Sequence, residues 1–220
     1  MGIRRGPNIV QSGLVLSLDA GNVRSYPGSG TTVSDVTGRG NSATLTNGAD
    51  YNSSNEGVFF CDGSNDYIDL GAGTDKAFAH NATWTVQFYF KPLAFVNTYP
   101  GILVKGGASG SGVLLYYGNT GVLYWKHNNA QTAIADTNFG IWHNIALAYA
   151  GSGNVTAYVD GVSAGPVGSM VSTNTSDNLL LGKGDEPGNN LIGPFYKYSR
   201  TLSASEILQN YNMTKSRFGK

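Results

Sequence analysis

Short segments in which apolar and polar side chains alternate recur along most of the chain, and this two-residue period constrains the fold most strongly. The clearest examples are residues 14–18 and 84–90, where every second side chain is Leu, Trp, Val or Phe. Successive side chains of a β-strand point to opposite faces, so these segments predict strands with one buried face. Further strands are predicted at residues 58–61, 67–70, 101–104, 113–117, 122–126, 142–149, 155–159, 178–181 and 195–198.

Turn-forming residues separate the predicted strands. Gly accounts for 31 of the 220 residues, about twice its usual share of roughly 7%. Residues 118–121 and 151–154 are rich in Gly and Asn, which tolerate the positive φ angles of tight hairpins. Consecutive strands are therefore expected to pair antiparallel.

One segment has helical spacing instead. Ser203 and Glu206 are placed as a capping box, and Ile207, Leu208 and Tyr211 follow at the spacing of one helix face. A short helix is predicted here, lying on the strands as a cover. The whole pattern predicts an all-β fold, a two-sheet antiparallel jelly-roll sandwich with one short C-terminal helix.

Length and charge limit the domain organisation and the partners. A β-sandwich can reach 220 residues as one domain, so residues 13–220 are assigned to the sandwich and residues 1–12 to an N-terminal arm. Basic and acidic residues balance at 14 each, which argues against a nucleic-acid partner. The sequence has no apolar run of the ~18 residues that a membrane helix needs, no secretory signal, and a single cysteine, Cys61, which cannot form an internal disulfide.

Seven segments, in order, resemble the concanavalin A-like, laminin-G-like jelly-roll sandwich found in bacteriophage structural proteins of the cyanophage type. They are GLVLSLDAGN with SYPGSGTT (13–32), DVTGRGN (35–41), FFCDGSNDYIDL (59–70), TWTVQFYFKP (83–92), WHNIALAY (142–149), AYVDG (157–161) and YSRTLSASEI (198–207). The resemblance covers most of the chain. It implies a lectin-like sandwich in a virion surface protein, made in the host cytoplasm.

Catalytic patterns are sparse. Retaining glycoside hydrolysis needs two carboxyl groups about 5 Å apart, but the only Glu residues are Glu56, Glu186 and Glu206, and no E-x-D-x-x-E pattern occurs. Residues 161–165 spell G-x-S-x-G, yet Pro166 follows where a nucleophile elbow needs a helix. The sequence predicts a protein that is not an enzyme. A polysaccharide-degrading enzyme that uses Tyr, His or Arg stays as an alternative.

Calcium is the one cofactor that the resemblance suggests. Asp35 and Asn41 lie in a segment that resembles the calcium-binding loop of such jelly rolls, where carboxylate and amide oxygens serve as ligands. The alternative for Asp35 is a hydrogen-bonded Asx turn. Asp62, Asp66 and Asp69 form a second acidic cluster, whose position in a predicted hairpin favours turn chemistry.

Carbohydrate binding needs an aromatic face that stacks on a sugar ring, with polar groups that bind the hydroxyls. One predicted hairpin with its exit, together with the loop at residues 185–190, supplies both kinds of group. The predicted sugar-binding residues are Tyr117, Trp125, His127, Asn128, Asp185 and Asn189. Side chains alternate, so only one of Tyr116 and Tyr117 can line such a groove. The alternative is that most of these aromatic residues belong to the core or cover a sheet.

The arm and the resemblance together suggest a role in an assembly. Arg4, Arg5, Gly6 and Pro7 belong to no predicted strand, and we expect the arm to contact other virion proteins in a homo-oligomer or larger assembly. The predicted function is a capsid decoration protein or fibre component whose lectin-like domain contacts cell-surface or environmental polysaccharide. A receptor-binding lectin module of a tail fibre is the alternative. Neither a nucleic acid nor a membrane is an expected partner.

Overall fold

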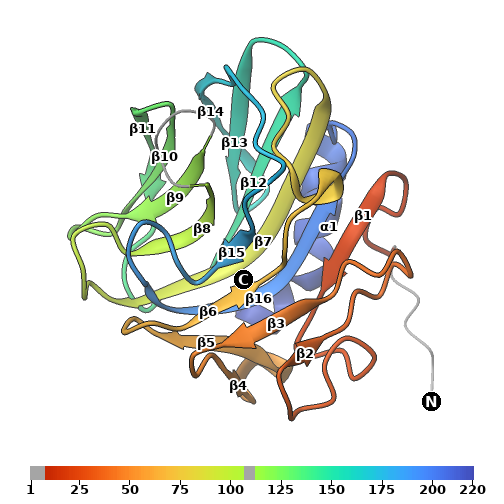
Figure 1. The fold of residues 1–220 in the computed structure, drawn as a ribbon, viewed down its shortest axis with the longest axis vertical. Coiled ribbons are helices and arrows are strands. Elements are labelled where there is room, and N and C mark those ends of the chain that lie inside the picture. The colour runs from red at the N-terminus through yellow and green to blue at the C-terminus, as the bar shows by residue number, and fades with distance from the viewer. Residues whose placement is uncertain (1–7, 107–111) are drawn as a thin grey trace.

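Two antiparallel sheets packed face to face form the body of the protein. The structure is a computed structural model that describes residues 8–106 and 112–220, and the strands of these residues form two eight-stranded sheets (Figure 1). Every ladder within the two sheets is antiparallel. The predicted two-sheet antiparallel sandwich is thereby confirmed.

Neighbouring strands within each sheet are often distant in the sequence. Sheet A consists, in spatial order, of β14 (Val162–Ser169), β13 (Asn154–Val159), β12 (His143–Ala150), β7 (Thr83–Ala94), β16 (Asn189–Tyr198), β5 (Val58–Asp62) and β4 (Asp50–Asn52), and β1 (Leu14–Leu18) also pairs with β16. Sheet B consists of β11 (Ala130–Asp136), β10 (Val122–His127), β9 (Val113–Tyr117), β8 (Gly101–Lys105), β15 (Leu179–Leu181), β6 (Tyr67–Asp69), β3 (Ala43–Thr46) and β2 (Thr32–Val33). Three short 3-10 helices, η1 (Ser54–Glu56), η2 (Thr74–Lys76) and η3 (Lys215–Phe218), and one α-helix, α1 (Ala204–Thr214), complete the described part.

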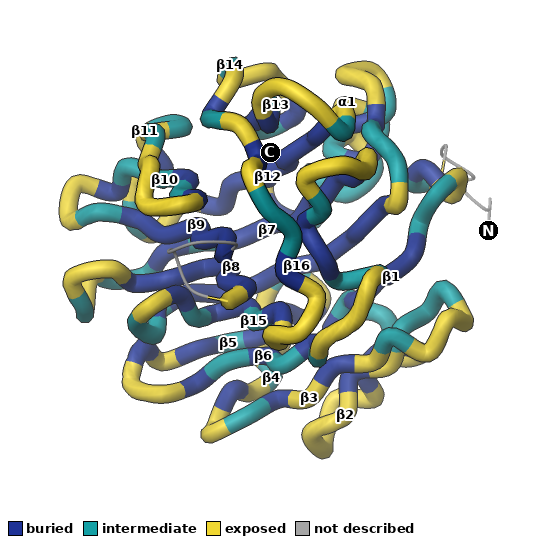
Figure 2. Tube along the Cα trace, turned by 45° about the horizontal axis from the view of Figure 1, so that its top comes forward, coloured by how far each residue is buried: buried dark blue, intermediate teal, exposed yellow. Residues whose placement is uncertain are grey.

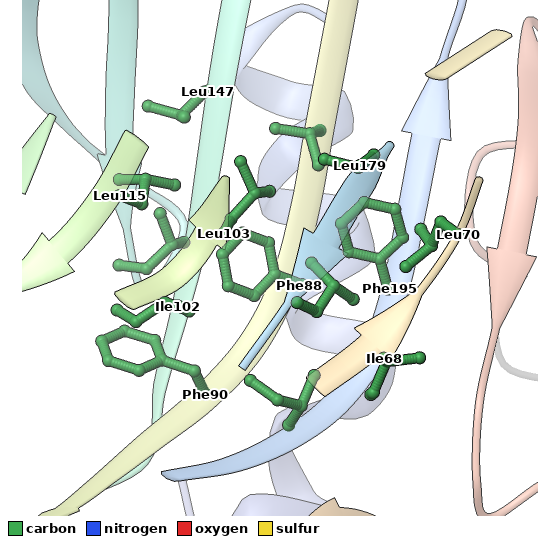
Figure 3. Packing of buried hydrophobic residues seen from close by; sticks show 14 of the residues in the cluster. Ile68, Leu70, Phe88, Phe90, Ile102, Leu103, Leu115, Leu147, Leu179 and Phe195 are labelled. Atoms are coloured by element: carbon green, nitrogen blue, oxygen red, sulfur yellow. The ribbon is translucent and has the colours of Figure 1, made fainter. Parts of the chain in front are cut away.

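Large apolar side chains fill the space between the sheets. Figure 3 shows Phe88, Phe90 and Phe195 of sheet A among Ile102, Leu103 and Leu115 of sheet B, and all six are essentially buried. Burying one such side chain stabilises the fold by roughly 1.5–3 kcal/mol. The alternation in β7 therefore predicts the inward face correctly.

The outer face of sheet A is covered as well, which the sequence predicts only in part. Helix α1 lies behind β7 and β16 (Figure 1), and both strands are buried along most of their length (Figure 2). The predicted capping box is present, since Glu206 N donates to Ser203 Oγ at 3.3 Å and Ser203 N donates to Glu206 Oε2 at 2.9 Å. Ile207 of α1 is fully buried against this sheet.

A buried polar network joins α1 to sheet A and to the first described residues. Asn210 Nδ2 donates to Gln87 Oε1 at 2.9 Å and to Tyr198 Oη at 3.0 Å, while Asn210 Oδ1 accepts from Val10 N at 2.8 Å. Tyr198 Oη in turn donates to Val10 O at 3.0 Å, and Gln87 Nε2 donates to Asn144 Oδ1 at 2.7 Å. Residues 8–12 of the predicted arm are therefore held by the protein's own chain, and residues 1–7 lie outside the described residues.

The segment η3 covers the other part of this outer face. The ring of Phe218 stacks on that of Tyr89, with centroids 4.1 Å apart, and its centroid lies 4.6 Å from that of Trp142. Arg217 forms an ion pair with Asp19, in which Nη1 donates to both carboxylate oxygens at 2.9 Å. The C-terminal residues thus belong to the packed structure.

Several hairpins have the turn chemistry that the sequence indicates. Asp160 and Gly161, with φ angles of 50° and 80°, connect β13 to β14. Ser163 of the G-x-S-x-G pattern lies in the hairpin strand that follows, so the pattern does not form a nucleophile elbow.

Asp160 also makes the fold sensitive to acid. Burial raises the pKa of its carboxyl. The His143 ring, whose Nδ1 lies 3.3 Å from Asp160 Oδ2, and hydrogen bonds from Asn144 N and Lys220 Nζ outweigh burial and lower this pKa to about 2. The folded-state pKa lies below the usual value of ~3.9, so the ionised form stabilises the fold above about pH 4 and this contribution is lost as the pH falls towards 2.

We expect Asp160→Asn to remove about 2 kcal/mol of the acid-induced loss of stability between about pH 5 and pH 2. Urea unfolding followed by circular dichroism at several pH values measures this effect. The exposed Asp136→Asn is the matched control and should keep the pH dependence of the wild type. Equal pH profiles for the wild type and Asp160→Asn would contradict the prediction.

Candidate functional site

Three of the six predicted sugar-binding residues lie in one groove at an edge of the sandwich. The groove forms where β11, at the edge of sheet B, comes close to β14, at the edge of sheet A, and its volume is about 380 Å³. We call it the edge groove. Its lining residues are Trp125, His127, Asn128, Ala130, Thr132, Asn154, Val167, Gly168, Ser169 and Val171.

The hairpin between β10 and β11 presents an amide to the edge groove. Asn128 and Asn129 connect these strands with φ angles of 49° and 61°, the backbone that a two-residue type I′ turn requires. Asn is among the few residues that adopt this conformation readily, and here the side chain of Asn128 is exposed at the groove. Asn154, the first residue of β13, is a second exposed amide.

His127 connects the segment before β9 to the segment after β14 through both of its ring nitrogens. Its Nδ1 lies 2.6 Å from Gly112 O, and its Nε2 accepts a hydrogen bond from Val171 N at 3.0 Å. Nδ1 therefore faces an acceptor, the Gly112 carbonyl, and Nε2 faces a donor, the Val171 N–H. The tautomer with its proton on Nδ1 satisfies both partners. His127 is 3% exposed, so it serves as a buried support for the segment after β14.

Trp125 and Tyr117 do not present the aromatic faces expected of them. Trp125 is 1% exposed and belongs to the core, so it contributes only part of the groove wall. Tyr117 is fully buried, and its hydroxyl donates to Ala94 O at 3.2 Å and to Asn189 O at 3.0 Å. The prediction that these rings stack on a sugar is wrong, because the space between the sheets takes both large side chains.

The other two predicted residues do not line the edge groove. Asn189 begins β16 and pairs with Ala94 and Asp62, while Asp185 is exposed in the loop before it. Asn189 accepts a hydrogen bond from Tyr117, and Tyr117 pairs with Leu123 near the start of β10. The edge groove lies at the opposite end of β10, where His127 is the last residue. The structure therefore divides the predicted set between two regions.

A second aromatic cluster, outside the predicted set of site residues, lies on the outer face of sheet B. Tyr99 is 44% exposed and Tyr124 is half-buried, whereas Tyr116 is only 3% exposed. The rings of Tyr116 and Tyr124 stack with centroids 5.1 Å apart, and Tyr99 meets Tyr116 edge to face at 5.5 Å. Tyr116 Oη donates to Gln131 Oε1 at 2.6 Å, and the Lys126 ammonium lies 5.8 Å from the centre of the Tyr99 ring. We call Tyr99, Tyr116 and Tyr124 the tyrosine face. The signal was present in the alternation of β9, which allowed either Tyr116 or Tyr117 to face outward.

Asp35 is surrounded by hydrogen-bond donors. Its Oδ1 accepts from Ser17 N at 3.1 Å and Thr37 N at 3.0 Å, and its Oδ2 accepts from Thr37 Oγ1 at 2.7 Å and Asn41 N at 3.2 Å. Asn41 Nδ2 donates to Val15 O and to Asp75 Oδ2. This donor set fits the Asx-turn alternative. Calcium binding at Asp35 and Asn41 stays a prediction. Within residues 8–106 and 112–220, no group of three or more His, Cys, Asp or Glu side chains is arranged to hold a metal.

We expect Asp35→Ala to lower the melting temperature equally with and without a calcium chelator. The loss of four hydrogen bonds to a charged acceptor should cost roughly 1–3 kcal/mol. Differential scanning fluorimetry with EDTA and with added Ca²⁺ measures both effects. If chelation lowers the melting temperature of the wild type and not that of Asp35→Ala, the calcium prediction holds instead.

The fold is a concanavalin A-like β-sandwich, and the sequence comparison gives its family. The family model described as the concanavalin A-like lectin/glucanases superfamily, Laminin_G_3, matches residues 62–208. The match covers more than half of the chain, so this chain belongs to that family. The comparison with curated proteins finds no matching sequence.

Solved structures with the same fold come from larger and smaller proteins. A Trypanosoma rangeli sialidase in complex with sialic acid aligns with a TM-score of 0.75 and 16% identity, over 98% of this chain and 35% of the sialidase. Domain 4 of AbnA, a GH43 extracellular arabinanase from Geobacillus stearothermophilus, in complex with arabinotriose, aligns with a TM-score of 0.67 and 18% identity, over 92% of this chain and 100% of that domain. The binding domain of Paraclostridial Mosquitocidal Protein 1 aligns with a TM-score of 0.71 and 14% identity, over 91% of this chain and 52% of that one. This chain spans about a third of the length of the sialidase.

The structure also bears on membrane crossing. Within the described residues, no helix is long and apolar enough to span a bilayer.

Proposed function

We propose that this chain is a carbohydrate-binding domain without catalytic activity and that the edge groove takes one or two sugar units. The carrying observation is the composition of the groove. Neutral amides and hydroxyls from Asn128, Asn154, Thr132 and Ser169 line the groove together with apolar side chains that include Val171. Uncharged polar groups match sugar hydroxyls, and a volume of 380 Å³ falls in the usual range of roughly 300–1,000 Å³ for small-molecule sites.

The arabinanase domain supports this proposal. It matches this fold over its whole length, and it is described in complex with arabinotriose. That precedent indicates that a separate domain of this size and shape binds an oligosaccharide. Its 18% identity supports the fold alone, so the sugar that this chain binds is left to experiment.

The chemistry of the groove supports binding over hydrolysis. Among its described lining residues none is Asp or Glu, so the groove does not supply the carboxyl pair of a glycoside hydrolase. Glu206 pairs with Arg200 at 2.5 Å, and Glu186 Oε2 accepts from Tyr99 N at 2.6 Å, both outside the groove. His127 is the one titratable side chain in the lining, and hydrogen bonds already engage both of its nitrogens.

The test is a glycan array probed with the wild type and with the double variant Asn128→Ala and Asn154→Ala. We expect bound glycans whose affinity falls at least about tenfold in the double variant, because lost hydrogen bonds of ~1.4 kcal/mol in sum have that effect. Asn52→Ala, an exposed amide of β4, is the matched control and should bind as the wild type does.

Three outcomes would contradict the proposal. An array without hits would argue against sugar binding altogether. Binding that is unchanged in the groove variant and lost in Tyr124→Ala would place the site on the tyrosine face. The release of reducing ends or unsaturated products from a bound polysaccharide would show that the domain is an enzyme.

We also propose that the domain works at the surface of a bacteriophage virion, as a capsid decoration protein or fibre component. The support is the resemblance of its seven motifs to phage structural proteins. Residues 8–12 pack on α1, so a test of the assembly role should remove residues 1–7 alone. We expect the shortened protein to fold normally and to lose incorporation into particles, and normal incorporation would refute a role for these residues in assembly.

A further inference from the structure

A lysine is buried inside the sandwich, and it is not one of the residues that line the edge groove. Lys197 of β16 is 2% exposed, and its Nζ lies 4.7 Å from the ring centre of Phe78 and 5.5 Å from that of Trp84. Cation–π attraction to two rings partly offsets the cost of burying the ammonium group. Among the described residues, no hydrogen bond or ion pair satisfies this nitrogen.

The lysine lines a small cavity that opens to the surface. The cavity has a volume of about 150 Å³, with Trp84 and Lys197 in its interior and the exposed residues Thr74, Thr83 and Ser199 at its rim. This volume equals that of roughly five water molecules at about 30 Å³ each. A molecule of two or three carbon atoms fits such a space.

The surroundings of Lys197 favour its neutral form. Burial is the main cause that lowers the pKa of Lys197 to about 7, repulsion from Lys105 lowers it further, and the Asp75 carboxylate opposes both. Lys105 is itself buried, and its ammonium group donates to Asp177 O at 2.5 Å. The neutral fraction of Lys197 at pH 7 is therefore far larger than the ~0.04% of a lysine with the usual pKa of ~10.4.

We propose that Lys197 is a reactive amine site that forms an imine with a small aldehyde entering this cavity. Asp75 also lines the cavity, and its negative charge disfavours a small anion as the ligand. A neutral carbonyl compound meets no such repulsion. The proposal is independent of sugar binding in the edge groove.

The reaction needs no oxidant or reductant. The lone pair of the neutral Nζ attacks the carbonyl carbon, and a new C–N bond forms as the carbonyl oxygen takes up a proton. Loss of water from this carbinolamine leaves a C=N bond. Both protons of the amine leave with the carbonyl oxygen as water, so the atoms balance.

The test uses glycolaldehyde as the probe and sodium cyanoborohydride to trap the imine as a secondary amine. After a short reaction of the full chain at pH 7, peptide mass mapping gives the labelled fraction at each lysine. We expect Lys197 to be labelled at least about tenfold faster than the partly exposed Lys126, because its neutral fraction is far larger. The rate at Lys197 should reach half its maximum near pH 7, whereas the rate at Lys126 should keep rising into the alkaline range.

Two controls separate the site from general amine reactivity. In guanidinium chloride, which removes the cavity, Lys197 and Lys126 should react at equal rates. Lys197→Arg keeps the positive charge beside Phe78 and Trp84, so loss of the fast phase in this variant assigns the phase to the amine. Slower labelling of Lys197 than of Lys126 in the folded protein, or a pH profile identical to that of Lys126, would overturn the proposal.

Discussion

We expect Asn210→Leu to lower the free energy of unfolding by roughly 3–5 kcal/mol. Asn210 is 1% exposed and holds three buried groups, the amide of Val10, the side-chain carbonyl of Gln87 and the hydroxyl of Tyr198. Each buried polar group that loses its partner costs about 1–3 kcal/mol. Leu has the same branched shape as Asn but is larger, so the loss combines the missing hydrogen bonds with some overpacking. Urea unfolding followed by circular dichroism measures it.

Asn212→Leu is the matched control for this experiment. Asn212 lies on the same helix, two residues further along, and is exposed. Its replacement should change the free energy of unfolding by less than about 0.5 kcal/mol. Similar values for the two variants would show that the buried network contributes little to stability.

Phe218→Ala should be the second most damaging change, with a loss of about 3–5 kcal/mol. The Phe218 ring is 4% exposed and packs against Tyr89 and Trp142, so its removal exposes apolar surface and leaves a cavity between η3 and sheet A. The melting temperature and the urea midpoint should both fall.

Phe95→Ala serves as the control for Phe218→Ala. Phe95 is 41% exposed, so replacing it with Ala removes the same ring without leaving a buried cavity. A loss below about 1 kcal/mol is expected for it. If Phe218→Ala is as mild as Phe95→Ala, then η3 is not a stabilising part of the sandwich.

The sequence predicts the strands that form the middle of the sandwich because their alternation is strong. Segments such as 84–90 and 142–149 carry large apolar residues at every second position, and they become β7 and β12. The capping box of Ser203 and Glu206 likewise locates α1. These signals are local, so they can be recognised without knowledge of the tertiary structure.

The edge groove could not be placed from the sequence because both strands that frame it have weak patterns. Residues 130–136, AQTAIAD, contain a single large apolar side chain, and residues 162–169, VSAGPVGS, resemble a loop through their Gly and Pro. Both form edge strands, where pairing on one side suffices and such residues are tolerated. Without β11 and β14 the groove lacks the two strands that face each other across it.

Burial of the predicted aromatic residues depends on tertiary packing as well. Tyr117 and Trp125 carry polar groups, and the sequence predicts them in a sugar site. The core accepts both rings, and the Tyr117 hydroxyl finds partners in the carbonyl oxygens of Ala94 and Asn189. Asn210 and Lys197 are likewise polar residues that the tertiary structure buries. A polar residue at a buried position becomes interpretable only when its partners from distant segments are known.

The pairing of β1 with β16 has a consequence for how the protein is made. Leu18 pairs with Phe195, so the first strand leaves the ribosome long before the strand that completes it. Sheet A cannot close, and α1 cannot settle on it, until nearly the entire chain has been synthesised. During that time the apolar face of β1 and the edges of the earlier hairpins are unprotected, which favours slow folding and aggregation. Expression at low temperature or with added chaperones should therefore raise the yield of folded protein.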